Sequence, residues 1–509
     1  GNTFVIQDEI ASSVANALQA TILGTTSIAT NVDSGGVEAR NLALIATASL
    51  ARRTLVDIRA ARDLYAQAST LAPNNPNYYA GYAQAVALQY WNFRDITPAE
   101  AIAEASAAVD RALELAAPSA DTLAIAGLVE ELRASTAEDP DAKARALSYY
   151  HRAIEQDPKN ILALQWLASI YLDINKPAEA RDAFEKVVEL DPLNTLALTG
   201  LANAYFNLGL RERGRQHLYK VQSLFPHLGM SYRYLSFDSW ATGRLDRSAF
   251  WINRSAELDP NPLEIFLLIQ NYVSLGWADK ALDAAEQFRQ SSSGVDISRL
   301  VQAQLDHDFE TLSVEAKQLH ESNGEQGYAT LSAWADAAAD NCQQSVTTLE
   351  RLYPSLKGET IEYIDSPDLI DAVLLAHCNK KIGRNDESMR LAIALLDSDL
   401  LNDSALEYRP ALRMVRVGLY AVMGEVQKAI SELSAIDVSQ AALALSSLAL
   451  PVDELPIFDN IKDHETFQAY ASQERYRIAQ QARMLASGET EKDIRLDVQA
   501  SGFELADWR

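Results

Sequence analysis

Four prolines recur at a fixed spacing and constrain the fold more than any other feature of the sequence. Pro158, Pro192, Pro226 and Pro260 follow one another at steps of 34 residues. The residue before a proline is disfavoured in a helix, so each proline predicts the end of a helix. A constant period of this length predicts a repeat protein, in which one small structural unit is copied along the chain.

The best-defined unit spans residues 161–194 and carries two apolar stripes at helical spacing. The first stripe consists of Leu164, Leu167, Ala168 and Tyr171, and the second of Ala180, Phe184 and Val187. The small side chains of Ala168 and Ala180 allow the two helix backbones to approach closely. A single helix pair cannot bury both of its faces, so the units are expected to stack on one another.

Seven residues of this unit fill signature positions of the tetratricopeptide repeat, and the sequence of the unit resembles that family. The seven are Leu164, Leu167, Ala168, Tyr171, Ala180, Phe184 and Pro192, while Val187 stands where the family has alanine. The resemblance implies an all-α fold, a right-handed superhelical solenoid of stacked helix–turn–helix pairs. It also implies a non-enzymatic scaffold that binds a protein, a peptide or a small effector.

The units divide the chain into four expected regions. Residues 1–36 form an N-terminal helix, with an apolar stripe over 4–23, and a polar linker; 37–290 form the regular superhelix with insertions. The period loosens after Ser291, so 291–463 are expected to form degenerate helical pairs. Residues 464–509 are expected to form a capping helix over 464–487 and a polar tail, since a stack needs a cap where its core would be exposed.

The N-terminal sequence carries a narrower resemblance. The segment FVIQDEIASSVANAL, residues 4–18, resembles the helix that joins a TolB-like domain to tetratricopeptide repeats in certain bacterial proteins. In that group the repeats follow either the DNA-binding domain and membrane span of a ToxR/CadC-type regulator or an adenylate-cyclase domain. The resemblance implies the sensor or interaction region of a larger bacterial signalling or regulatory protein. The alternative is a structural adaptor in a multiprotein envelope assembly.

Composition and motifs exclude several classes of function. The net charge of −26 disfavours nucleic acid and anionic membrane as partners, because both are bound by clustered Lys and Arg. No apolar run is long enough to span a bilayer. The seven histidines include no pair at metal-ligand spacing, and no nucleophile elbow, phosphate-binding loop or dinucleotide fingerprint occurs. We therefore expect no enzyme, no cofactor and no metal site.

The candidate binding residues come from the resemblance, because the first helices of stacked tetratricopeptide repeats line the concave face. The positions that usually point into this face are Gln165, Ser169, Asp173, Thr199, Asn203, Phe206, Asn207, Arg233, Phe237 and Trp240. Polar anchors beside aromatic walls are typical of peptide sites. For Phe237 and Trp240 two placements stay open, in the groove or in the core of a loosened repeat. The identity of the partner and the oligomeric state stay undetermined.

The two cysteines carry information about the cellular compartment of the protein. Cys342 is expected at the start of the second helix of one pair, and Cys378 late in the first helix of the next. These helix ends lie side by side in an antiparallel stack, so a disulfide between them is sterically feasible. A disulfide indicates an oxidising compartment and favours the periplasm, whereas two buried thiols favour the cytoplasm.

Overall fold

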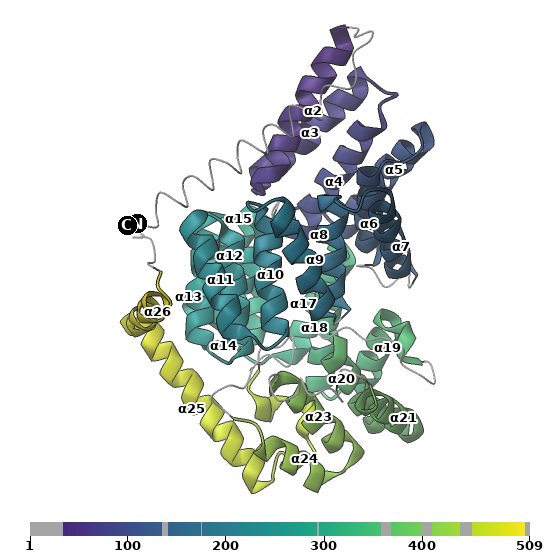
Figure 1. Cartoon of the computed structure of the whole chain (residues 1–509). Coiled ribbons are helices and arrows are strands. Elements are labelled where there is room, and N and C mark those ends of the chain that lie inside the picture. Colours follow the sequence, from purple (N-terminus) through teal and green to yellow (C-terminus); the bar gives the residue numbers. More distant parts are fainter. Residues whose placement is uncertain are drawn as a thin grey trace.

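The computed structural model describes residues 34–134, 141–174, 176–292, 295–357, 368–398, 401, 410–437 and 450–503. Within these ranges the secondary structure is helical, and no strand occurs. The helix expected over 4–23 lies outside the described residues, and so do residues 24–33 of the expected linker. Figure 1 shows the helices stacked in pairs along the chain. The fold is an all-α solenoid.

The first half of the chain forms seven antiparallel helix pairs within the described ranges. Their bounds are α2 Ser34–Arg52, α3 Leu55–Leu71, α4 Pro76–Phe93, α5 Pro98–Leu115, α6 Ala120–Ala134, α7 Ala142–Gln156, α8 Ile161–Asp173, α9 Pro177–Leu190, α10 Thr195–Asn207, α11 Arg211–Leu224, α12 Gly229–Ala241, α13 Leu245–Leu258, α14 Pro262–Ser274 and α15 Ala278–Ser291.

The second half continues the same pairing and ends in two further helices. The elements are α16 Ser298–Leu305, α17 Phe309–Asn323, α18 Gln326–Ala338, α19 Cys342–Leu352, the 3₁₀ turn Pro354–Lys357, α20 Asp368–Lys381, α21 Asn385–Leu396, α23 Pro410–Met423, α24 Val426–Ser434, the 3₁₀ turns Val452–Glu454 and Pro456–Phe458, α25 Glu465–Ser487 and α26 Glu489–Ala500. None of the described helices is both long and apolar enough to cross a membrane.

A repeated four-residue turn separates successive pairs in the regular region. At 157–160 and 191–194 the sequence reads Asp-Pro-x-Asn. The side chain of Asn160 accepts a hydrogen bond from the backbone N–H of Ala163 (2.8 Å), and Asn194 makes the matching bond (2.9 Å). Each turn therefore stops one helix with its proline and starts the next with an asparagine cap.

Close packing within and between pairs depends on glycines that face aromatic rings. A Cβ atom on Gly127 would lie 2.5 Å from the ring of Tyr150, and one on Gly200 would lie 2.4 Å from the ring of Phe184. Both rings are fully buried. The absence of a side chain at these two glycines lets the aromatic rings lie directly against the neighbouring helix backbone.

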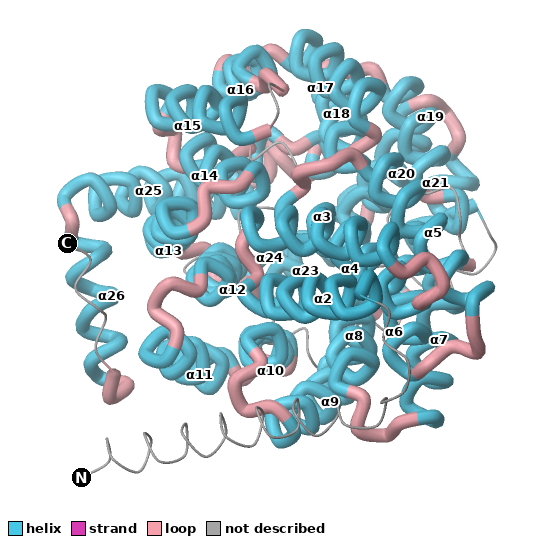
Figure 2. Tube along the Cα trace, turned by 90° about the horizontal axis from the view of Figure 1, so that it is seen from above, coloured by secondary structure: helices cyan, strands magenta, loops and turns pink. Residues whose placement is uncertain are grey.

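The solenoid curls far enough for distant pairs to touch. Figure 2 shows helices α8 to α18 curving around the middle of the view, where α4 lies together with α2 and α3. Helix α4 contacts α14, and the guanidinium of Arg94, just after α4, lies 3.9 Å from the carboxylate of Glu325 at the start of α18. The concave face is therefore partly filled by the chain itself.

The C-terminal helices depart from the expected cap and tail. Helix α25 covers the range in which a capping helix is expected, but it runs back along the stack and packs against α13 (Figure 1). The side chain of Gln481 donates a hydrogen bond to the carbonyl of Gly243 and accepts one from the N–H of Leu245. The expectation of a polar tail from 488 is wrong over 489–500, because Ile494 and Val498 form a buried stripe on α26.

The two cysteines lie where the helix pairing predicts, and the structure joins them. Cys342 is the first residue of α19, Cys378 lies in the last turns of α20, and their Cα atoms are 4.8 Å apart. That separation lies within the usual range for a disulfide, and the two residues form one. The bridge fastens two successive helix pairs to each other.

Two buried carboxyl groups lie in the C-terminal half and have raised pKa values. Asp371 accepts hydrogen bonds from Trp334 Nε1 and from the Tyr353 hydroxyl, both at 2.7 Å, and burial raises its pKa to about 6. Glu474 accepts a hydrogen bond from the N–H of Val452 (3.0 Å), and burial raises its pKa to about 7. Both groups are thus easier to protonate in the folded chain than in the unfolded chain.

This arrangement predicts that the contribution of the two carboxyl groups to stability falls as the pH rises. Their unfolded pKa values are about 4. The contribution is therefore fully present below about pH 4 and is lost as the pH passes through the folded values. Thermal unfolding of wild type and of Asp371→Asn/Glu474→Gln between pH 5 and pH 8 tests this, and the double variant should have the flatter profile. Parallel profiles would contradict the assignment.

Candidate functional site

Three of the predicted binding residues make contacts between neighbouring repeat units. Gln165 Oε1 accepts a hydrogen bond from Asn194 Nδ2 (3.4 Å), and the Thr199 hydroxyl lies 3.4 Å from the sulfur of Met230. The third residue is Arg233, whose Nη1 lies 3.1 Å from the carboxylate of Glu264. Gln165, Thr199 and Arg233 are all buried. The chain itself supplies the partners of these side chains.

The other seven predicted residues divide between surface and interior. Ser169 donates to the carbonyl of Gln165, and Asn207 donates to Asn203; all three polar residues are half-buried, whereas Asp173 is exposed. The aromatic residues differ from one another: Phe206 is buried, Trp240 packs against the core, and Phe237 is 39% exposed with its ring edge-on to that of Tyr234.

A large groove lies along the N-terminal half of the stack. Its volume is about 1170 Å³. It is lined by residues of α2, α3, α4 and α6, by the turn between α2 and α3, by the turns before α8, α10 and α12, and by the first turns of α8 and α10. Of the ten predicted residues, all of which the structure describes, Gln165 alone lines this groove.

Apolar, amide and charged side chains line the groove, and the charged ones are Arg52, Arg53, Asp57, Asp121, Asp157, Lys159 and Asp191. The apolar side chains are Leu50, Ile125, Ile161, Leu162, Leu193, Leu196, Phe225 and Leu228, and the amides are Asn77, Gln84, Asn160, Gln165 and Asn194. Two of the amides are held in place, since Asn160 Nδ2 donates to Asp121 (2.6 Å) and Asn194 donates to Gln165. A mixture of apolar surface and a few fixed polar groups is typical of a ligand site.

Arg53 is the most unusual residue in the groove. It lies in the turn between α2 and α3 and adopts a left-handed backbone conformation with a φ of 57°. The corresponding residue just before the second helix is a glycine in other pairs, for example Gly209, Gly243 and Gly276. A non-glycine residue there is a strained choice, and such strain often accompanies function.

The guanidinium of Arg53 has no carboxylate partner among the described residues. Its neighbour Arg52 pairs with Asp57 at 2.5 Å, whereas Arg53 is half-buried and lies 5.9 Å from the ring centre of Trp166. Burial lowers the pKa of Arg53 to about 10, so the side chain remains charged at neutral pH. The groove therefore contains a positive charge that no described anion neutralises.

The ring beside Arg53 also has an unused donor. The indole of Trp166 is buried, and its Nε1–H has no acceptor in the part of the chain that the structure describes.

Arg53 was not among the residues predicted from the sequence. The signal that identifies it is an arginine in a turn position where several other units have glycine, although His307 and Asp340 occupy the same position in two of the later pairs. In the described ranges, no group of three or more His, Cys, Asp or Glu residues could hold a metal ion.

Comparisons with known proteins bear on the family. Tetratricopeptide-repeat models match residues 149–182 and 167–227. These matches cover the second helix of one pair and the two regular pairs from α8 to α11. No curated protein matches the chain.

Several solved structures are similar to the chain in part. A tetratricopeptide-repeat protein from Parabacteroides merdae is 17% identical, with 55% of this chain and 99% of that chain covered and a TM-score of 0.34. Cut9–Hcn1 of the APC/C is 14% identical (81% and 85% covered, TM-score 0.37), and the type IV pilus biogenesis factor PilW is 13% identical (44% and 98% covered, TM-score 0.33). The repeat models and the helix pairs described above agree over the same stretch. Residues 149–227 therefore consist of tetratricopeptide repeats.

Proposed function

We propose that this chain is a non-enzymatic scaffold that binds an extended segment of a partner protein in the groove between α2–α4 and the turns before α8, α10 and α12. The observation that carries the proposal is the half-buried Arg53, a cation without a described carboxylate partner inside a groove of about 1170 Å³. A carboxylate of the bound segment is the partner that its charge and geometry favour.

The length and lining of the groove support an extended peptide over a small molecule. The groove draws its walls from five successive helix pairs, from α2–α3 to α10–α11, and from the turn that follows them. The side-chain amides of Asn77 and Gln84 make no hydrogen bond with another described residue, so they can pair with the backbone of a peptide. The apolar side chains can receive alternate residues of that peptide.

We also propose that the scaffold is the interaction region of a larger bacterial signalling or regulatory protein and lies in the periplasm. The resemblance of residues 4–18 to a TolB-to-repeat linker supports the first part. The disulfide between Cys342 and Cys378 supports the second, since disulfides persist in oxidising compartments such as the periplasm.

Replacing Arg53 by glycine tests the groove without disturbing the fold. Glycine accepts the left-handed turn, so helix content and melting temperature should stay close to those of the wild type. Loss of a charge-assisted hydrogen bond should weaken peptide binding about ten-fold or more. The probe is a peptide with a free carboxylate, selected on the full chain from a random-sequence display library and measured by fluorescence anisotropy.

Asp340→Gly is the matched control. Asp340 occupies the equivalent turn position between α18 and α19, also with a positive φ (59°), and it does not line the groove. This variant should bind the selected peptide as tightly as the wild type. Equal affinities for all three proteins would contradict the proposed site.

A further inference from the structure

Helix α26 covers a face of the solenoid formed by α11, α12 and α13. It packs on α13, and its buried residues Ile494 and Val498 belong to one apolar cluster with Tyr219, Leu235 and Trp251. We call this face the α26 cradle and define it by those three residues with Arg244 and Arg247. The cradle is more than 230 residues away from α26 in the sequence.

Charge complementarity aligns α26 on the cradle. Asp493 lies 3.0 Å from Arg244 and 2.7 Å from Arg247, and Asp497 lies 2.5 Å from the other nitrogen of Arg247. The two acidic residues are one helical turn apart, next to the apolar pair of α26. The cradle thus recognises an acidic residue and an apolar residue repeated every four positions.

The link to the rest of the chain allows α26 to separate as a unit. Gly488 ends α25 and precedes α26 with a φ of 75°, and a side chain added there would meet nothing within 4 Å. The packed residues of α26 are few, namely Thr490, Ile494 and Val498, while Leu496 is 65% exposed. The Thr490 hydroxyl donates a buried hydrogen bond to Asp246 (3.0 Å), and Phe503 packs on the same apolar cluster. A short helix with so few buried contacts and partly exposed ion pairs can open locally more easily than the helix pairs beneath it.

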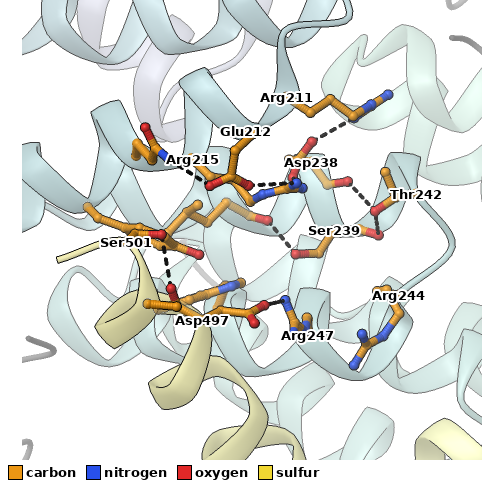
Figure 3. A pocket seen from close by; sticks show the side chains of 15 residues that line it. Arg211, Glu212, Arg215, Asp238, Ser239, Thr242, Arg244, Arg247, Asp497 and Ser501 are labelled. Carbon is orange, nitrogen blue, oxygen red and sulfur yellow. Dashed lines mark hydrogen bonds and ion pairs between the residues drawn. The ribbon is translucent and has the colours of Figure 1, made fainter. Parts of the chain in front are cut away.

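The cradle is larger than the helix that occupies it. A cavity of about 500 Å³ remains between α11, α12, α13 and the end of α26, and Figure 3 shows the side chains that line it. Two further arginines, Arg211 and Arg215, face Asp238 at 2.6 Å and 2.9 Å on the far side of this cavity. Ala500 of α26 borders the cavity with only a methyl group.

We propose that the α26 cradle is a docking surface for an acidic amphipathic helix of a partner protein, and that α26 occupies it within the chain until the partner displaces it. The arginines of the cradle set the acidic character of the partner. The unfilled cavity next to Ala500 defines the size of the partner's side chain there, since a side chain larger than that of alanine fills space that α26 leaves empty. This surface is separate from the groove at Arg53.

The test measures binding of a fluorescent peptide with the sequence of residues 488–503 to the full chain. In the wild type the tethered helix competes at high effective concentration, so binding is weak. Asp493→Arg/Asp497→Arg in the full chain removes the ion pairs, and hydrogen exchange should show the loss of protection of α26. This variant should bind the peptide at least about ten-fold more tightly than the wild type. Asp493→Ala/Asp497→Ala, a milder change, should give an intermediate affinity.

Two altered peptides separate a docking surface from a simple intramolecular contact. A peptide carrying Ala500→Phe should bind the opened variant more tightly than the unaltered peptide, because the phenyl ring enters the cavity. A peptide carrying Leu496→Phe, which enlarges an exposed position, should bind as the unaltered peptide does.

Three results would overturn the proposal. One is an α26 that stays protected from exchange in the opened variant, and another is an opened variant that does not bind the unaltered peptide. The third is an Ala500→Phe peptide that binds no more tightly than the Leu496→Phe peptide, because the cradle then accepts no helix bulkier than α26.

Discussion

Replacing Arg233 with glutamate is expected to lower the free energy of unfolding by about 3–5 kcal/mol or more. Arg233 and Glu264 form an ion pair at 3.1 Å, with side chains only 11% and 3% exposed. The substitution leaves Glu264 without its cation and adds a second buried carboxylate beside it. Urea unfolding at neutral pH measures the effect, and hydrogen exchange shows whether α12 and α14 lose protection together.

An exposed ion pair provides the matched control for this prediction. Arg289 and Glu286 lie 2.5 Å apart on α15, and both side chains are about half exposed. Arg289→Glu should leave the urea midpoint of unfolding close to that of the wild type, because solvent screens the pair. If Arg233→Glu proved as mild as Arg289→Glu, Arg233 would be free for a ligand and the pairing with Glu264 would be wrong.

Removing the disulfide is the second large change that we expect. Cys342 and Cys378 are 36 residues apart in the sequence. The chain-entropy relation gives about 4 kcal/mol for closing a loop of this length in the unfolded chain. Cys342→Ala/Cys378→Ala should therefore melt at a lower temperature than the oxidised wild type. The helix content should be unchanged, because α19 and α20 keep their other buried contacts.

A reductant separates the bridge from the effect of changing two buried side chains. Dithiothreitol should lower the melting temperature of the wild type and leave that of the double alanine variant unchanged. Protein isolated without reductant from the periplasm should show no reactive thiols after denaturation. Two reactive thiols would contradict the bridge and remove its support for the periplasmic location.

Local patterns in the sequence were sufficient to predict the helix pairs. The 34-residue proline period and the stripes of unit 161–194 depend only on contacts between near neighbours, so they are visible in the sequence. The placement of Cys342 and Cys378 at adjoining helix ends followed from the same pairing. These features become structure through packing between successive units.

Contacts between distant units could not be predicted in the same way. The return of α25 and α26 to α13 joins residues such as Gln481 and Gly243, which no local periodicity connects. The polar composition of 488–509 suggested a tail, because its apolar stripe consists of only Ile494 and Val498. The curvature that brings Arg94 close to Glu325 is likewise a property of the whole stack.

The candidate site was only partly predictable because family positions do not show what a neighbouring unit supplies. Arg233 occupies a position that often faces a ligand, but Glu264 stands 31 residues later and neutralises it. Thr199 and Met230 have the same offset. Complementary residues at this offset are a sequence signal that a position is used between units. Arg53 carries the opposite signal, a charge in a turn where glycine is usual.

The location of a bound peptide tests the central claim most directly. Hydrogen exchange of the full chain, with and without a saturating amount of the selected carboxylate-bearing peptide, measures it. We expect protection at residues 50–57, 157–162 and 191–196, which contribute to the groove, and no change over α16 to α21. Protection confined to α16–α21, with the groove segments unchanged at full occupancy, would contradict the proposal that this groove is the binding site.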